Sequence, residues 1–306
     1  MQNATVVSLL PSATEILCAL GLQKQLVGVS HECDFPQEIK GLPVLTESKI
    51  DPNAPSAQID GKVRTLVQKG LSLYEIRTDL LQTLKPDWIF TQDQCEVCAV
   101  SLEDVTCAVK DLFQSPVNIC SLKPESLDDI WRDIRKVAEA MGVEERGEKI
   151  VQAIYHRINP LRGCFSTRPR VACLEWLDPP MVAGGWIPEI VEIAGGEPVI
   201  VSEPGPFKEV SWDTLREVDP DFLVLMPCGF SVERTEAELK NIPDGIRQLR
   251  AVQQGRCYIV DGNAYFNRPG PRIADSCEIL AALVHPEKCL AFLNRYRSAI
   301  AQWPRS

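Results

Sequence analysis

Short apolar runs alternate with amphipathic stretches along the chain. The apolar runs end in polar, Gly or Pro residues, as buried strands do, while the stretches between them have helical spacing. Strands are predicted at Thr5–Leu10, Leu26–Val29, Trp88–Thr91, Val117–Ser121, Arg170–Glu175, Phe222–Met226 and Cys257–Val260. Strands that alternate with helices favour parallel sheets, so the pattern predicts an α/β fold with Rossmann-like lobes.

The longest amphipathic stretch lies at the middle of the chain. Its apolar spacing predicts one helix of about 18 residues from Val143 to Leu161. Glu144 and Glu145 at its start and Arg157 near its end suit the helix dipole. We therefore expect an N-terminal α/β lobe at 1–142, a linking helix at 143–162 and a C-terminal α/β lobe at 163–306.

The two sides of this helix resemble each other. Each contains a short helical run, a Pro-Asp turn and an apolar strand: Leu73–Ile76, Leu84–Asp87 and Trp88–Thr91 on one side, Ser211–Leu215, Val218–Asp221 and Phe222–Met226 on the other. Two copies indicate two similar lobes rather than a solenoid. The alternative is that helix, Pro-Asp turn and strand recur independently, as they do in many α/β proteins.

Two local signals predict helix boundaries. Ser12-Ala13-Thr14-Glu15 has the pattern of a capping box, which places a helix start at Ser12. In the first copy of the repeat, a helix is expected from about Tyr74 to Leu84.

Bulk properties narrow the class of protein. A chain of 306 residues is long enough to form two domains, each with its own hydrophobic core. Its net charge of −10 argues against nucleic-acid binding. No apolar run is long enough to span a membrane. Met1 leads almost directly into the first strand without a signal-like segment, so we expect a cytoplasmic protein, or a periplasmic one if a signal was trimmed.

The 12 cysteines favour free thiols over a disulfide framework. Several of them are in apolar strands or helices, where a thiol packs as a small hydrophobe: Cys18, Cys107, Cys120, Cys173, Cys257 and Cys277.

Candidate binding residues cluster in the loops that follow the strands. In open α/β sheets ligands bind off the carboxyl ends of the strands. Aromatic and hydrogen-bonding side chains together are typical of a cleft for a large, flat ligand. The candidates are His31, Glu32, Gln92, Gln94, Cys95, Trp176, Trp186, Phe207, Tyr265, Phe266 and Arg268. The alternative is that these aromatic residues only cap the cores of the lobes.

Metal and redox chemistry have one candidate segment, Cys95-Glu96-Val97-Cys98. A structural zinc site needs four ligands, and no second CxxC exists. A composite site with His31, Glu32 and Cys33, a redox dithiol, and a pair of packing cysteines are three alternatives that the sequence leaves open. His31 is also a candidate axial ligand for cobalt or iron. The chain lacks the common nucleophile, phosphate-loop and metalloprotease motifs, so no catalytic residues are predicted and a non-enzymatic protein is favoured.

Motifs along essentially the whole chain resemble the vitamin B12 and iron-siderophore periplasmic-binding family. They are Val6–Glu15, Leu26–Ser30, Asp34–Pro36, Leu84–Asp87, Gly195–Glu197, Glu209–Ser211 and Phe266–Arg272. The cobalamin-binding branch is the most similar, and Gln92–Ser101 looks like a mark of its signal-less subgroup. The resemblance implies two α/β lobes joined by one rigid helix, with a metal chelate bound between the lobes and little movement on binding.

The resemblance also assigns roles to individual positions. Trp176 and Phe207 match aromatic residues that contact the corrin ring, whereas His31 and Glu32 replace an expected aromatic residue and Met181 replaces another. The acids through which the family docks on a membrane transporter match Glu75 and Asp213.

These observations favour a monomeric protein that binds a corrinoid such as cobalamin, or a related metal chelate, in the cleft between the lobes. It would need no cofactor, and its partners would be the chelate and an ABC permease. The alternative is a cytoplasmic protein that processes such a chelate or acts in redox chemistry through Cys95 and Cys98. A third hypothesis is an interaction or regulatory module that has retained the fold but has lost the ability to bind the ligand.

Overall fold

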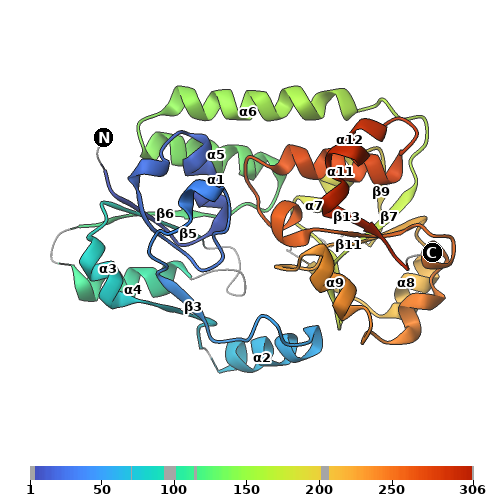
Figure 1. The fold of residues 1–306 in the computed structure, drawn as a ribbon, viewed down its shortest axis with the longest axis horizontal. Coiled ribbons are helices and arrows are strands. Elements are labelled where there is room, and N and C mark those ends of the chain that lie inside the picture. The colour runs from blue at the N-terminus through green and yellow to red at the C-terminus, as the bar shows by residue number, and fades with distance from the viewer. Residues whose placement is uncertain (1–3, 70, 93–100, 114–115, 201–206, 305–306) are drawn as a thin grey trace. The chain divides into compact units, whose positions relative to one another are not determined.

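The computed structural model describes residues 4–69, 71–92, 101–113, 116–200 and 207–304. The chain forms two compact units, each with its own sheet. The N-terminal unit comprises residues 1–54, 58–124 and 128–152, and the C-terminal unit comprises 55–57, 125–127 and 153–306. Helix α6 (Glu144–Ile158) begins in the first unit and ends in the second (Figure 1).

The sheet of the N-terminal unit is parallel throughout. Its strand order is β2 (Leu26–Val29), β1 (Val6–Ser8), β5 (Trp88–Gln92) and β6 (Asn118–Leu122). A separate antiparallel pair joins β3 (Thr46–Ser48) to β4 (Tyr74–Ile76). The helices along this part of the chain are α1 (Pro11–Ala19), α2 (Ser56–Gln68), α3 (Thr78–Leu84), α4 (Leu102–Leu112) and α5 (Leu127–Ala140), with the 3₁₀ turns η1 (Gln23–Gln25) and η2 (Gln37–Ile39).

The sheet of the C-terminal unit mixes directions. Strands β7 (Arg170–Leu177), β9 (Glu197–Pro198), β11 (Phe222–Leu225) and β12 (Cys257–Val260) are parallel, whereas β8 (Pro180–Ala183), β10 (Phe207–Glu209) and β13 (Ile300–Gln302) are antiparallel to their neighbours. Its helices are α7 (Ile187–Ile193), α8 (Trp212–Val218), α9 (Val232–Glu238), α10 (Arg250–Gln253), α11 (Ile273–Val284) and α12 (Leu290–Arg295). Short turns complete it: η3 (Asn159–Leu161), η4 (Asp244–Gln248), the π-helical η5 (Gly262–Phe266) and η6 (Arg297–Ala299).

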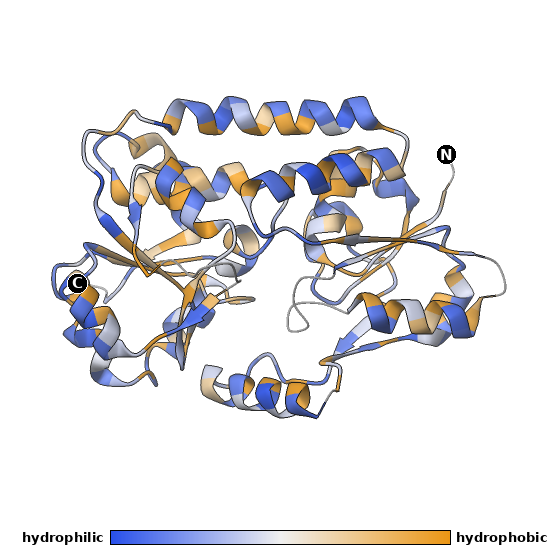
Figure 2. Cartoon of the chain, turned by 180° about the vertical axis from the view of Figure 1, so that it is seen from behind, coloured by the Kyte–Doolittle hydropathy of each residue, from blue (hydrophilic) through white to orange (hydrophobic). Residues whose placement is uncertain are grey.

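These sheets confirm the predicted α/β class. Each predicted strand is present, and the buried faces of β1, β5, β7 and β11 supply the cores of the two units. In Figure 2 the strands carry many of the hydrophobic residues, as strands buried on both faces should.

The repeated turn is present in both units with the same backbone geometry. Helices α3 and α8 end at Lys85 and Asp219, which have φ values of 46° and 48°. The amide of each donates to the carbonyl four residues earlier, at 3.2 Å and 3.1 Å. A proline follows each of these residues, and the residue before a proline is disfavoured in the right-handed helical region, so the helix ends there.

The aspartate after each proline then joins two neighbouring strands. The Asp87 amide donates to the Thr5 carbonyl at 2.9 Å, and its carboxylate accepts from the Thr5 amide at 2.7 Å. Asp221 and Arg170 make the same pair of bonds at 2.8 Å and 2.9 Å. The similarity of the two sides predicted from sequence therefore extends to individual hydrogen bonds.

Two local predictions were wrong. Helix α1 begins at Pro11 after Leu10, with no side-chain cap, so Ser12 lies inside the helix and forms no capping box. Proline at the first helical position needs no amide partner, which removes the need for that cap. The helix expected from Tyr74 begins only at Thr78, because residues 74–76 pair with β3 as an extended strand.

Helix α6 buries one stripe of apolar residues. Val151, Ile154 and Ile158 are at most 4% exposed, while hydrophilic residues cover most of the rest of the helix (Figure 2). Gly147 packs closely against α5: a Cβ at this position would be 2.5 Å from the Cβ of Ala138. A glycine is therefore required by packing and not by backbone conformation.

Replacing a helical glycine by alanine usually stabilises a protein, but this contact predicts the opposite effect at Gly147. Gly147→Ala should destabilise the protein by about 1–3 kcal/mol, because overpacking outweighs the gain in helix propensity. Gly61→Ala in α2, where an added Cβ meets nothing within 4 Å, should stabilise it by about 0.5–1 kcal/mol. Denaturant unfolding of both variants measures the difference, and equal stabilisation by both would contradict the close approach.

A buried carboxylate in α5 predicts a pH-dependent stability. Asp133 is 7% exposed, and its Oδ2 has no hydrogen-bond partner among the described residues. Burial raises the pKa of Asp133 to about 7; Lys136 acts in the opposite direction and Asp129 adds to the rise. The folded protein therefore holds a proton that the unfolded chain releases between about pH 4 and pH 7, and stability falls as the pH rises through this range.

Asp133→Asn should remove this loss because the amide carries no charge. We expect the variant to match the wild type near pH 4 and to exceed it by about 2–4 kcal/mol at pH 8. Asp128→Asn, on the same helix with a side chain 75% exposed, should change stability little at either pH. Urea unfolding at both pH values tests this, and a gain of the same size at pH 4 would rule out titration of Asp133 as its source.

Candidate functional site

A group of small polar side chains gathers at the carboxyl ends of the N-terminal strands. Ser8 ends β1 and Ser30 follows β2. The hydroxyl of Thr14 contacts Ser8 Oγ at 2.8 Å and Cys33 Sγ at 3.1 Å, and the Glu32 amide donates to Ser30 Oγ at 3.1 Å. The carboxyl ends of parallel strands meet at one edge of a sheet, which is why these residues come together.

His31 is held by Thr46 at this edge. The backbone amide of His31 donates to Thr46 Oγ1 at 3.0 Å, and its Nδ1 lies 2.7 Å from the same oxygen. The ring also packs against Tyr74 at 5.4 Å between centroids. These contacts fix the plane of the imidazole and direct Nε2 away from Thr46, with Glu32 Oε1 3.6 Å from it.

The imidazole of His31 is neutral near pH 7. Burial lowers its pKa below the ordinary value, although the charge of Glu47 acts in the opposite direction. The side chain is nevertheless 27% exposed, so it can still be reached from solvent. A neutral, oriented and accessible imidazole suits hydrogen bonding or coordination of a metal.

In the C-terminal unit the main feature is a tilted aromatic pair at the end of β7. Trp176 pairs with Met181 of β8, and its ring lies 5.4 Å from that of Phe230. The guanidinium of Arg234 lies 4.4 Å above the centroid of Phe230 and donates to Glu238 at 3.1 Å. Trp176 is partly exposed, whereas Phe230 is buried between this ring and the Arg234 cation, so Trp176 supplies the accessible aromatic surface here.

The loop after β12 is fixed against the loop after β11. A Cβ on Gly262 would lie 2.4 Å from the Pro227 carbonyl oxygen, so only glycine fits. The Asn263 amide donates to the Phe230 carbonyl at 3.2 Å, and Asn267 Nδ2 donates to the Met226 carbonyl at 3.2 Å. The two exit loops therefore form one surface within the C-terminal unit.

Tyr265, Trp186 and Phe266 have different environments in this surface. The ring of Tyr265 is partly exposed and packs between Arg272, at 5.4 Å, and Tyr296, at 5.9 Å. Phe266 is fully buried, and its carbonyl accepts from Trp186 Nε1 at 3.1 Å. Phe266 therefore supports the loop from inside, while Tyr265 and Trp186 are partly exposed.

The remaining candidates vary in accessibility. Arg268 is 3% exposed and donates to Asn263 Oδ1 at 3.0 Å, and Gln92 is 8% exposed at the end of β5. Phe207, on the edge strand β10, is 41% exposed. Gln94, Cys95 and Cys98 lie outside the described residues.

All cysteines in the described part of the chain are free thiols. Burial raises the pKa of Cys173 to about 12 and that of Cys120 to about 11, as expected of thiols that pack as hydrophobes. Within the same residues, no three His, Cys, Asp or Glu side chains come close enough together to hold a metal ion. A composite site of Cys95 and Cys98 with His31 would require residues outside the described part.

Sequence reasoning did not identify Thr46, Tyr74 or Arg234. The first two lie on strands, β3 and β4, one of which was predicted as helix, and no linear pattern links them to His31. Arg234 had a usable signal: Ser231 caps α9 by accepting from the Arg234 amide at 3.2 Å, which places that side chain in the first turn after an exit loop.

Among the described residues, no helix combines the length and apolar character that crossing a membrane would require.

Comparison with known proteins identifies the class. Residues 6–264 match the family model described as periplasmic binding protein. This match covers most of the chain, so the protein belongs to the periplasmic binding protein family and is a substrate-binding protein by class.

Relatives and solved structures of this class cover most of the chain. The chain is 22% identical over 291 residues to an uncharacterized ABC transporter substrate-binding lipoprotein, YvrC, of Bacillus subtilis, covering 92% of this chain and 80% of the relative. It is 24% identical over 281 residues to the vitamin B12-binding protein of Vibrio parahaemolyticus, covering 89% and 88%. Among solved structures, it matches the periplasmic heme-binding protein HutB of Vibrio cholerae with a TM-score of 0.71 and 19% identity, covering 94% of this chain and 100% of that one.

A further structural match is the periplasmic vitamin B12-binding protein BtuF of Vibrio cholerae, with a TM-score of 0.67 and 21% identity over 93% of this chain and 98% of that one. At these identities the structural matches establish the fold alone. The names of the relatives do not support the expected cytoplasmic location, because they describe periplasmic proteins and a lipoprotein.

Proposed function

We propose that this protein binds a metal chelate of the corrinoid type, such as cobalamin, and delivers it to an ABC permease. The observation that supports the proposal is a pair of partly exposed aromatic rings at strand ends of the C-terminal unit, Trp176 and Tyr265, each packed against a second aromatic ring. Rigid aromatic surface binds a flat macrocycle at little entropic cost.

Each unit would contribute a different kind of contact. The C-terminal unit offers stacking surface, with Arg234 and Arg272 beside the rings. The N-terminal unit offers His31, Glu32 and hydroxyl groups that can bond amide side chains of a corrinoid. We assign Trp186, Phe207 and Gln92 to the margins of the site, and Phe266 and Arg268 to the support of its loops. The chelate is the cargo, and no other cofactor is required.

The names of the relatives support this choice of ligand class. One is a vitamin B12-binding protein and two solved structures bind vitamin B12 or heme. Both are flat tetrapyrrole-type chelates with a central metal, which is the common chemistry that the aromatic surface fits. A permease partner implies a site of action outside the cytoplasm, and we propose that location.

Removal of the Trp176 ring should weaken ligand binding strongly. Trp176→Ala should raise the Kd for cyanocobalamin or dicyanocobinamide at least tenfold, because a buried aromatic contact contributes about 1.5–3 kcal/mol. Trp88→Ala is the matched control, since Trp88 lies at the amino end of β5 and stacks on Phe90 at 6.0 Å. Calorimetric and absorbance titrations, with haemin as a third probe, measure Kd. The proposal fails if the wild type binds none of the three, or if Trp88→Ala weakens binding as much.

Two ligands can distinguish coordination of the metal by His31 from a contact between His31 and another part of the ligand. Dicyanocobinamide has both axial positions filled, whereas aquacobinamide has an exchangeable one. If His31 coordinates the metal, His31→Ala should weaken aquacobinamide at least tenfold and dicyanocobinamide much less, and should abolish the shift in the cobalt absorption band. His156→Ala, at an exposed position of α6, should change neither. Equal losses for the two ligands would assign His31 a contact role only.

For the docking acid of the N-terminal unit we propose Asp79 in place of Glu75, from a comparison of the two repeated turns. Asp213 lies in the first turn of α8 with a side chain 74% exposed, six residues before the turn residue Asp219. The position six residues before the equivalent Lys85 is Asp79, in the first turn of α3 and 72% exposed. Glu75 instead lies on β4, opposite Glu47. We therefore propose Asp79 and Asp213 as the paired docking acids.

Charge reversal tests this assignment. Asp79→Lys and Asp213→Lys should each abolish capture of a purified corrinoid ABC permease in detergent, because each would place a cation against a basic partner surface. Glu75→Lys should retain capture, and all three should bind the chelate as the wild type does. Loss of capture with Glu75→Lys and its retention with Asp79→Lys would reverse the assignment.

A further inference from the structure

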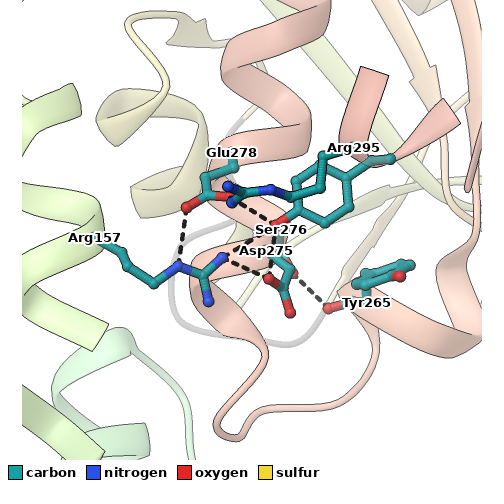
Figure 3. Close-up of polar contacts among 7 residues, drawn as sticks. Arg157, Tyr265, Asp275, Ser276, Glu278 and Arg295 are labelled. Atoms are coloured by element: carbon teal, nitrogen blue, oxygen red, sulfur yellow. Dashed lines mark hydrogen bonds and ion pairs between the residues drawn. The ribbon is translucent and has the colours of Figure 1, made fainter. Parts of the chain in front are cut away.

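A partly buried charged network fixes the end of α6 to α11 and α12 within the C-terminal unit (Figure 3). Arg157 donates from Nε to Glu278 Oε1 at 2.9 Å and from Nη2 to Asp275 Oδ1 at 2.5 Å. Glu278 is 3% exposed, and Arg295 donates to its second oxygen at 2.9 Å. Two guanidinium groups and two carboxylates therefore balance in charge.

Tyr296 completes this network, called here the Arg157 network. Its hydroxyl lies 2.6 Å from Glu278 Oε2 and 2.7 Å from Asp275 Oδ1, and it accepts from Arg157 Nη2 at 3.0 Å. Burial and the bonds to both carboxylates raise the pKa of Tyr296 above its usual range, so the hydroxyl keeps its proton. With one proton, it can donate to only one carboxylate at a time, and Arg157 must hold the other.

The Arg157 network is connected to Tyr265 by two routes. Ser276, fully buried and next to Asp275 in α11, donates to the Tyr265 carbonyl at 2.6 Å (Figure 3). The ring of Tyr296 packs against the ring of Tyr265 at 76°. Both the backbone and the ring of Tyr265 are thus held by groups whose positions the network sets.

A charged network built around a buried carboxylate is not an efficient source of stability. Desolvation offsets most of the attraction within a buried ion pair, and apolar residues of the same volume often stabilise a fold as well. Charged hydrogen bonds add directionality, because the planar guanidinium can donate only to partners that lie in a narrow range of positions. We therefore expect the network to fix the positions of the groups that it joins more than to raise the stability of the fold.

We propose that the Arg157 network positions the Tyr265 loop, and that Arg157 and Ser276 are positioning residues for ligand binding. The link to binding rests on the proposed function, whereas the effect on the loop does not. The loop carries its own reporters: the amides of Asn263, Ala264, Tyr265 and Asn267 are all hydrogen-bonded, at 3.2, 2.7, 3.2 and 3.1 Å.

Hydrogen exchange of the ligand-free protein tests the effect on the loop. Ser276→Ala removes the bond to the Tyr265 carbonyl and leaves the ion pairs intact. It should accelerate exchange of the amides at 263–267 by about two- to tenfold, the loss expected for one hydrogen bond, and leave the amides of β11 and β12 unchanged. Ser298→Ala, at an exposed position, is the control. Unchanged exchange, or equal acceleration throughout the unit, would overturn the proposal.

Arg157→Lys tests the source of the positioning. Lysine keeps the charge but cannot bond two carboxylates in one plane, so the same amides should exchange faster, and Arg162→Lys should have no effect. In the binding arm, Ser276→Ala and Arg157→Lys should raise the Kd for dicyanocobinamide about three- to tenfold, with an unfolding midpoint close to that of the wild type. Faster exchange with unchanged Kd would separate the loop from binding. If the wild type binds no chelate, only the proposed function fails, because the exchange result needs no ligand.

Discussion

The fold depends on one requirement: a single helix shared by two units must be fastened at both ends. In the N-terminal half of α6 the fastening is close packing, because Gly147 lets the helix approach Ala138. Arg146 adds a hydrogen bond to the Leu20 carbonyl at 2.9 Å, which satisfies a backbone group left open near the end of α1. In the C-terminal half the fastening is the Arg157 network. The N-terminal half is held by close packing and a charged hydrogen bond, and the C-terminal half by the charged network.

The Arg157 network connects the helix to the candidate site. Charged, directional hydrogen bonds fix the relative orientation of the groups they join. Asp275 and Ser276 are consecutive in α11, so the side chain that accepts from Arg157 and the side chain that bonds the Tyr265 carbonyl share one helical turn. The end of α6 and the Tyr265 loop are therefore parts of one structure within the C-terminal unit.

The sequence predicted the fold more completely than the site. Buried parallel strands are continuous apolar runs in the sequence, so they were predicted correctly. The repeated Pro-Asp turn was also predicted, because a proline restricts the backbone of the residue before it and this effect depends on local sequence alone. Residues Tyr74 to Ile76 were misread as helix, since their extended form depends on pairing with β3, some thirty positions away in the chain. The site depends on such distant pairings: Thr46 orients His31, and Arg272 and Tyr296 enclose Tyr265. The exit-loop rule located the right loops, but it could not separate a buried Phe266 from a partly exposed Tyr265 in the same turn.

The contrast between the two exit surfaces bears on ligand selection. Arg234 and Arg272 lie against aromatic faces in the C-terminal unit, where cation and ring together favour a large delocalised ligand. In the N-terminal unit the corresponding surface consists of hydroxyl groups and a histidine whose pKa is lowered by burial, so it offers hydrogen bonds and a neutral nitrogen. A purely apolar ligand would gain no hydrogen bonds from these polar groups, and a purely ionic one would not use the aromatic rings. A flat chelate with polar side groups and a metal centre carries groups that suit each of these two surfaces, which is why the proposed class of ligand is favoured.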